Sequence, residues 1–208
     1  MKIKVRASAI FVILASVLAN GCEFIALFWL SAAVHESGHL LAAKIERKRV
    51  ERIEIGFSGA RIGISDGLLG YGEEFFIAFM GPFFNFLAAF AVVLIFWSGE
   101  MTVESVIESG LRFLENGGGD RVEKAGFFAL SSLAQAFLNL LPIKSLDGGR
   151  MLNSLLSAVL GEGAGERVTE TCTVIVAFLS WMTAVYLMIK FSAGIALFAF
   201  AFWVIFKF

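Results

Sequence analysis

Apolar residues gather into six long runs along the chain, separated by shorter polar segments. The runs are Val5–Ala19, Glu23–Ala43, Phe75–Trp97, Ala125–Leu141, Thr171–Ile189 and Phe191–Phe206. A helix needs about 20 predominantly apolar residues to cross a bilayer. The pattern therefore predicts an all-α polytopic membrane protein with about six transmembrane helices. Because only Lys190 separates the last two runs, five crossings with a re-entrant end are the alternative.

The pattern changes from helical to alternating between the second and third runs. Residues 53–57 and 60–64 alternate apolar with polar or small side chains, and Ser58-Gly59 lies between them as turn material. This arrangement predicts a short, membrane-associated β-hairpin after the second helix, with a surface loop as the alternative. The segment from Ser98 to Lys124 is acidic and glycine-rich, and we expect it to be a loop.

Composition supports a membrane protein and excludes other classes. The 208 residues are 58% hydrophobic and only 17% charged, with a mean hydropathy of +0.82. A soluble domain could not bury so much apolar surface. The net charge of −1 gives no reason to expect a nucleic-acid partner. We expect a single domain, residues 1–208, surrounded by the lipid bilayer.

The start of the chain is also typical of a secretory signal. Met1–Arg6 is basic, an apolar stretch follows, and Gly21-Cys22 comes next. We interpret this segment as a retained first helix, because Ala19-Asn20 is a poor approach to a lipidated cysteine and another apolar run begins at once. Cys22 and Cys172 form neither a metal pair by spacing nor a disulfide framework.

Basic residues indicate the orientation of the helices. With the N-terminus in the cytoplasm, 13 of the 17 lysines and arginines lie inside. The remaining four, Arg112, Arg121, Lys124 and Lys190, lie outside. Positive residues favour the cytoplasmic side, so both termini are predicted to be cytoplasmic.

The second apolar run contains polar residues toward its C-terminal end. His35 and His39 are four residues apart, so a helix presents both imidazoles on one face, and Glu36 follows the first of them. This H-E-x-x-H spacing indicates two zinc ligands and a glutamate that acts as general base. A chance match is the alternative. Histidine and glutamate are costly at membrane depth, however, and usually mark a functional site there.

A catalytic zinc usually has three protein ligands and a water. His35 and His39 are the only histidines in the chain, so the third ligand must be a carboxylate or a cysteine. Asp147 is the best candidate, because it follows the fourth run on the predicted side of His35, between Pro142 and flexible glycines. The alternative is that Asp147 caps the helix that follows it. We expect one zinc ion per chain.

Three stretches together resemble the site-2 protease family of intramembrane zinc metalloproteases: His35–His39, Asn139–Pro142 and Leu146–Arg150. The stretch Gly81-Pro82-Phe83-Phe84-Asn85 is similar to a further family element. The short N-terminus and the six runs look most like the stage IV sporulation protease branch. Members of that branch often carry a CBS domain, and other family members carry a PDZ domain. We expect neither in this chain.

The resemblance implies a zinc metalloendopeptidase that hydrolyses peptide bonds in or near transmembrane segments of membrane-tethered proteins, as in regulated intramembrane proteolysis. It implies zinc ligands at His35, His39 and Asp147, with Glu36 as general base for a zinc-activated water.

The resemblance also suggests further site residues and partners. Asn139 and Asn85 are candidates for orienting substrate or stabilising an oxyanion, with helix packing as the alternative for both. The edge of the hairpin could receive the substrate as an added strand. The expected substrate is a single-span or membrane-associated protein, such as a transcription-factor precursor, in a prokaryotic cytoplasmic membrane. A homo-oligomer or an inhibitory membrane partner is also compatible with the resemblance.

Two other functions remain open at this point. A membrane metal-ion transporter also places histidines and carboxylates within the bilayer. Such a protein usually shows an internal repeat, which this sequence lacks, and Glu36 would have no necessary role in it. A catalytically inactive homologue that binds membrane partners is the second alternative, against which the intact H-E-x-x-H motif argues.

Overall fold

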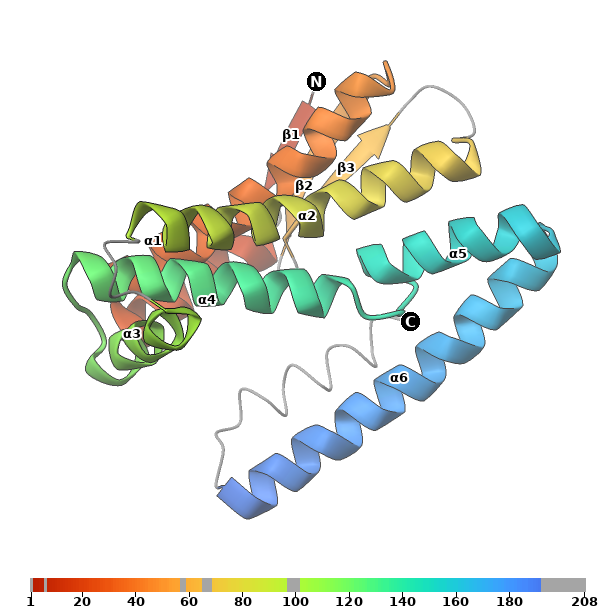
Figure 1. Cartoon of the computed structure of the whole chain (residues 1–208). Helices are drawn as coiled ribbons and strands as arrows, with labels where there is room; N and C mark the ends of the chain where they lie inside the picture. Colours follow the sequence, from red (N-terminus) through yellow and green to blue (C-terminus); the bar gives the residue numbers. More distant parts are fainter. Residues whose placement is uncertain (1, 6, 57–58, 65–68, 97–101, 192–208) are drawn as a thin grey trace. The chain divides into compact units, whose positions relative to one another are not determined.

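The computed structural model describes residues 2–5, 7–56, 59–64, 69–96 and 102–191 (Figure 1). Beyond Phe191, the sixth predicted run lies outside the described residues. The chain forms two compact units that alternate along the sequence. The first comprises Met1–Leu69 and Phe79–Leu138, and the second comprises Gly70–Ala78 and Asn139–Phe208. The single-domain organisation stays a prediction.

Helices dominate the described residues, in agreement with the helical class that the sequence predicts. The elements are β1 (Lys2–Val5), α1 (Ala7–Ile45), β2 (Val50–Gly56), β3 (Gly59–Ile64), α2 (Tyr71–Ile95), α3 (Val103–Asn116), α4 (Arg121–Asn139), α5 (Asp147–Leu160) and α6 (Glu162–Phe191).

The first two predicted runs form one continuous helix. The sequence predicts a break between Val5–Ala19 and Glu23–Ala43, but α1 continues through Asn20 and Gly21, so this boundary is wrong. The physical reason is that no proline occurs here. A single glycine inside a helix costs only about 1 kcal/mol, which the neighbouring turns offset.

The pairing of β1 shows that α1 is bent. β1 pairs parallel with β2, from Lys2 opposite Arg52 to Val5 opposite Ile55. A straight helix of 39 residues would separate its first and last Cα atoms by about 57 Å. The chain also connects these two atoms by a second path, from Ala7 to Val5, across to the paired Ile55, and back to Ile45. At about 3.6 Å per residue and about 4.8 Å between strands, this path is at most about 48 Å long. The helix therefore curves or kinks between its ends.

The alternating segments form strands. β2 and β3 pair antiparallel, with Ile53 opposite Ile62 and Gly56 opposite Gly59, and the pairing shifts register near Val50. The sheet order is β1-β2-β3, so β2 is paired on both sides (Figure 1). Within this sheet only the outer edges of β1 and β3 are open to another strand.

Helix α3 occupies part of the segment that the sequence predicts to be a loop, so that prediction is wrong. Thr102 caps its start: the Thr102 hydroxyl accepts from the Ser105 N–H, and the Thr102 N–H donates to the Ser105 hydroxyl. The buried residues Val106, Ser109, Gly110 and Phe113 then follow at helical spacing. The cap uses serine at a position where glutamate or glutamine is the usual signal, so the sequence pattern did not indicate it.

Small residues bring the helices of the first unit together. Ser132 of α4 donates to the Ser31 hydroxyl of α1 at 3.0 Å. A Cβ on Gly110 of α3 would lie 2.9 Å from the carbonyl oxygen of Gly126 in α4. The buried core beside these contacts comprises Ala89, Val92, Val106 and Ala129. Close backbone approach through small residues is typical of helices that pack within membranes.

Large apolar side chains on α2 face outward. They are Phe79, Phe83, Leu87, Phe90 and Leu94, which are 37% to 57% exposed. Their spacing of three or four residues places them on one side of the helix. In water such a stripe would be unfavourable, at about 25 cal/mol per Å² of apolar surface, whereas lipid tails remove that cost. The helix therefore suits a bilayer.

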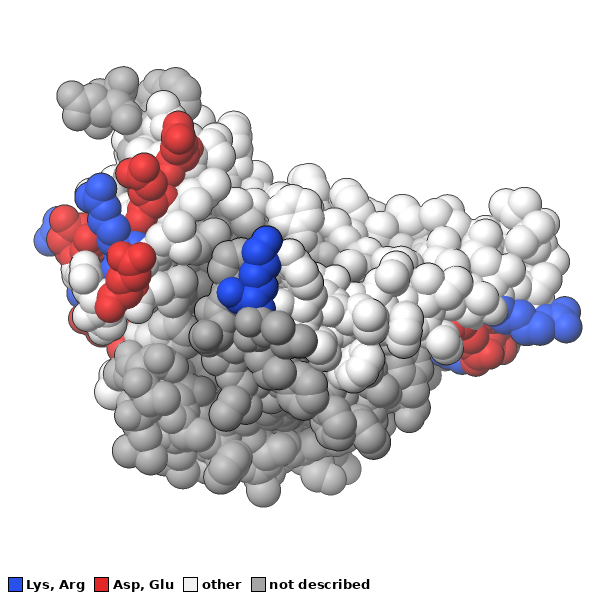
Figure 2. All heavy atoms as spheres, turned by 90° about the horizontal axis from the view of Figure 1, so that it is seen from below, with Lys and Arg blue, Asp and Glu red and all other residues white. Residues whose placement is uncertain are grey.

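Two helices of the described chain are long and apolar enough to cross a membrane. They are Cys22–Ile45, within α1, and Tyr71–Ile95, which is α2. The predicted runs at Ala125–Leu141 and Thr171–Ile189 lie largely in α4 and α6, so the count of six spans stays a prediction. On the face shown in Figure 2, most of the described surface is uncharged.

Candidate metal centre

His35 and His39 lie one turn apart on α1, as the sequence predicts. Both side chains are buried, at 5% and 6% exposure. Their Nε2 atoms are 3.1 Å apart, and the two rings meet edge to face. The two nitrogens are thus directed at one point, away from bulk water.

This separation suits a shared metal. Two nitrogen ligands at about 2.05 Å from a tetrahedral zinc would lie about 3.3 Å apart. The observed 3.1 Å is close to that value. A direct hydrogen bond between the two rings would give a similar distance. Helix α1 therefore holds the two nitrogens at a suitable separation with or without a metal ion.

Asn85 contacts the first of these histidines from α2. Its side chain is fully buried, and Nδ2 lies 3.2 Å from Nδ1 of His35. Its Oδ1 has no hydrogen-bond partner among the described residues. Rotating the amide by half a turn would direct Oδ1 at His35, where it could accept a hydrogen bond from the Nδ1–H group. A histidine that binds zinc through Nε2 carries that proton, so Asn85 can select the ligating tautomer.

Two glycines allow α2 to approach the histidines. A Cβ on Gly81 would overlap Nε2 of His39 and lie 2.9 Å from Cε1 of His35. A Cβ on Gly38 would overlap the carbonyl group of Met80. Gly81 belongs to the stretch that resembles a family element in the sequence. Only the packing shows that a side chain at this position would overlap the histidines.

Asp147 is buried at the start of α5 in the second unit, at 8% exposure. The N-cap of this helix is Leu146, which makes no side-chain capping bond, and Asp147 is the first helical residue. The alternative that Asp147 acts as the cap is therefore wrong. Its carboxylate still benefits from the positive end of the helix dipole. Arg150 Nη1 lies 3.8 Å from Asp147 Oδ1, and Arg150 Nε lies 3.6 Å from Glu74 Oε1.

The described residues include three buried side chains of types that bind metals: His35 and His39 in the first unit and Asp147 in the second. Two imidazoles and one carboxylate are a donor set that zinc accepts in hydrolytic sites. The other predicted site residues are half-buried: Glu36 follows His35 on α1, and Asn139 ends α4.

Comparisons with known proteins found a family match over part of the chain and a structural match over most of it. Residues 119–183 match the family described as Peptidase family M50. That stretch contains Asn139 and Asp147 but not the two histidines. A comparison with curated protein sequences found no match. The structure is similar to that of the site-2 protease from Methanocaldococcus jannaschii, with a TM-score of 0.62 and 21% identity over 98% of this chain and 87% of that chain. The chain therefore has the fold of a site-2 protease.

Proposed function

We propose that the protein is an intramembrane zinc metalloendopeptidase that cleaves membrane-tethered substrates in or near their transmembrane segments. The observation that carries this proposal is the buried His35–His39 pair, whose Nε2 atoms converge at 3.1 Å within an apolar helix. The match of residues 119–183 to Peptidase family M50 and the similarity to a site-2 protease structure support it.

In this proposal one zinc ion is held by His35, His39 and Asp147. When bound, zinc polarises a water molecule and lowers its pKa to about 7. Glu36 would accept a proton from the attacking water and would later donate one to the nitrogen of the leaving peptide. The low exposure of both histidines keeps the reaction away from bulk solvent and strengthens the electrostatic interactions within the site.

The two asparagines take different roles. Asn85 orients His35, as its 3.2 Å contact with Nδ1 supports. Asn139 orients the substrate or stabilises the developing oxyanion from the end of α4. The substrate is a single-span or membrane-associated protein that must present an extended segment, and an open edge of the β-sheet receives it by backbone pairing. The enzyme resides in a prokaryotic cytoplasmic membrane as a multi-pass protein with both termini in the cytoplasm, an orientation that the basic residues favour.

Glu36→Gln tests the proposal, because it removes the base and keeps the size of the side chain. We expect purified Glu36→Gln protein to retain about one zinc per chain, as for a residue outside the ligand set. Cleavage of co-expressed single-span precursors should fall by at least about 100-fold, the lower range for loss of a general base. The measurements are metal analysis of detergent-purified protein and scoring of the cleaved product.

A Glu36→Gln protein that still cleaves at the rate of the wild-type protein would contradict the proposal. Zinc uptake into vesicles by the Glu36→Gln variant, with no cleavage by the wild-type protein, would support a metal-ion transporter instead.

A further inference from the structure

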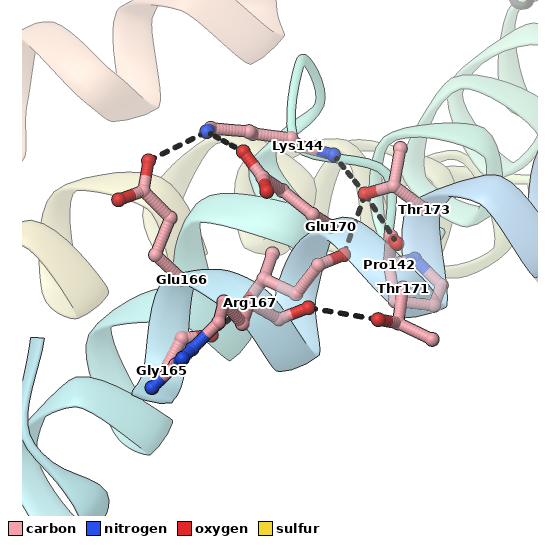
Figure 3. Close-up of polar contacts among 9 residues, drawn as sticks. Pro142, Lys144, Gly165, Glu166, Arg167, Glu170, Thr171 and Thr173 are labelled. Carbon is pink, nitrogen blue, oxygen red and sulfur yellow. Dashed lines mark hydrogen bonds and ion pairs between the residues drawn. The ribbon is translucent and has the colours of Figure 1, made fainter. Parts of the chain in front are cut away.

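One face of α6 holds the loop that leads to Asp147. Figure 3 shows the Lys144 side chain extended over this helix. Its Nζ donates to Glu166 Oε1 and to Glu170 Oε1, each at 2.7 Å. The backbone N–H of Lys144 donates to the Thr173 hydroxyl at 2.9 Å. A single loop residue is thus bound to α6 through both its side chain and its backbone.

The Thr173 hydroxyl lies near two carbonyl oxygens, that of Thr169 at 2.8 Å and that of Pro142 at 3.5 Å. It donates to the carbonyl of Thr169 one turn earlier at 2.8 Å, which leaves its lone pairs for the Lys144 N–H (Figure 3). Thr173 and Thr169 are both fully buried. An N–H donor that loses its acceptor in such surroundings is costly, so this contact constrains the loop more strongly than an exposed contact would.

Apolar packing holds the neighbouring loop residue. Ile143 is fully buried against Ala177 of α6, with Leu141, Leu146 and Val176 around it. Four residues of α6 that contact the loop, Glu166, Glu170, Thr173 and Ala177, are referred to here as the loop-binding stripe. Their spacing of three or four residues places them on one side of the helix.

The loop transmits this position to Asp147 within three residues. The Leu146 N–H donates to the Ile143 carbonyl at 2.8 Å, which closes a tight turn. Immediately after Asp147, a Cβ on Gly148 would overlap the Leu140 carbonyl, and a Cβ on Gly149 would overlap the Ile143 carbonyl. Because this turn is tightly packed, a shift of Ile143 or Lys144 would also shift Asp147.

Charge on the stripe supports the same contact at neutral pH. The hydrogen bond from Lys144 lowers the pKa of Glu166, and the hydrogen bonds to Glu166 and Glu170 raise the pKa of Lys144. Both groups lie at the surface, so these ion pairs add to a fixation that depends mainly on the buried Thr173 and Ile143.

We propose that the loop-binding stripe of α6 positions Asp147 for metal binding, with Thr173 as the principal positioning residue. The inference rests on the proposed function, in which Asp147 is a zinc ligand. Thr173 acts through the backbone of Lys144. Its loss should therefore weaken metal binding and turnover without changing the ligand set. Partners that orient ligands in this way typically contribute about 10- to 100-fold in affinity or activity.

Thr173→Val tests the inference, with Thr171→Val as matched control. Thr171 lies on the same helix, and its hydroxyl bonds only to the Arg167 carbonyl of α6 among the contacts drawn in Figure 3. We expect Thr173→Val to weaken zinc affinity by about tenfold or more and to lower kcat with little change in KM. Thr173→Ser, which keeps the hydroxyl, should restore both values, and Thr171→Val should match the wild-type protein. Zinc affinity is measured by competition with a chelator, and kcat and KM with a purified single-span substrate.

A second variant covers the case in which Thr173→Val fails to fold. Glu166 and Glu170 are about half exposed, so the double variant Glu166→Gln and Glu170→Gln should fold. We expect it to weaken zinc affinity by about two- to fivefold, as for exposed ion pairs.

Equal zinc affinity and kcat in Thr173→Val and Thr171→Val would overturn the inference. So would wild-type affinity in the double variant, if Thr173→Val does not fold. Asp147→Ala separates this failure from that of the proposed function. If Asp147→Ala loses zinc while the stripe variants do not, only the positioning role is wrong. If Asp147→Ala binds zinc as well as the wild-type protein, the ligand assignment itself fails.

Discussion

The orientation of the Asn85 amide and the binding of a metal by His35 would depend on each other. With Nδ2 toward His35, the contact favours a ring whose Nδ1 has no proton, and Oδ1 stays unsatisfied among the described residues. With Oδ1 toward His35, the ring carries its proton on Nδ1 and presents a free lone pair on Nε2. Zinc binding at Nε2 therefore favours the second orientation of the amide.

Replacement of Asn85 should separate a tautomer effect from a packing effect. We expect Asn85→Leu, which cannot accept a hydrogen bond from the Nδ1–H group, to weaken zinc affinity by about 10- to 100-fold. Asn85→Asp keeps an acceptor at the same place and should stay within a few-fold of the wild-type protein, because carboxylates commonly fill this role. Chelator competition on purified protein measures both. An equal loss in the two variants would assign Asn85 to helix packing alone.

The sequence predicts the two histidines of this site, but not the role of Asn85. His35 and His39 depend only on helical periodicity within one run, which a sequence shows directly. Asn85 is 50 residues from His35, and their contact depends on how α1 packs against α2. That packing in turn depends on the absence of side chains at Gly38 and Gly81, which no periodicity indicates.

The sheet limits where a substrate strand can add. β2 is paired with β1 on one side and β3 on the other, so residues 52–55 cannot accept a further strand. The proposal that an extended substrate pairs with the hairpin is therefore narrowed to the outer edges of β1 and β3. Of these two strands, β3 (Gly59–Ile64) belongs to the β-hairpin that the sequence predicts as the docking site for the substrate.

Proline scanning along β3 can test edge pairing, because each proline removes one N–H donor. Successive N–H groups of an edge strand point alternately to its partner and outward. Prolines at the outward positions should strongly reduce cleavage while zinc content stays normal. Prolines at the alternate positions should disturb the pairing with β2. Alanine at the outward positions should have little effect. Tolerance of proline at every outward position would show that the substrate does not pair with β3.

Element boundaries show where sequence patterns are weakest. The helical run at Phe75–Trp97 closely predicts α2, because apolar residues and a clear polar start at Glu73-Glu74 agree. The start of α3 was missed, since its cap depends on a Thr102–Ser105 pair that resembles ordinary loop sequence. In α1, the sequence indicates a reversal near Asn20, but the backbone remains helical there.

At the scale of the whole molecule, the bend of α1 bears on the membrane topology that the sequence predicts. A straight α1 would cross once and leave β1 far from β2, which their pairing excludes. A bent α1 can instead return the N-terminal strand to the side of β2, the arrangement that the distribution of basic residues favours. Under that topology Lys2, Lys4 and the loop after α1 share the cytoplasmic side.

Cysteine labelling can test this topology in intact cells. Cys22 is exposed on α1 and Cys172 is half-buried on α6, and both are free thiols. With the N-terminus in the cytoplasm, Cys22 lies at the outer end of the first crossing and Cys172 at the inner end of a later one. We therefore expect an impermeant thiol reagent to modify Cys22 in intact cells and Cys172 only after permeabilisation. The single-cysteine variants Cys22→Ala and Cys172→Ala assign each signal. Modification of Cys172 alone in intact cells would reverse the orientation and place the H-E-x-x-H segment toward the opposite face of the membrane.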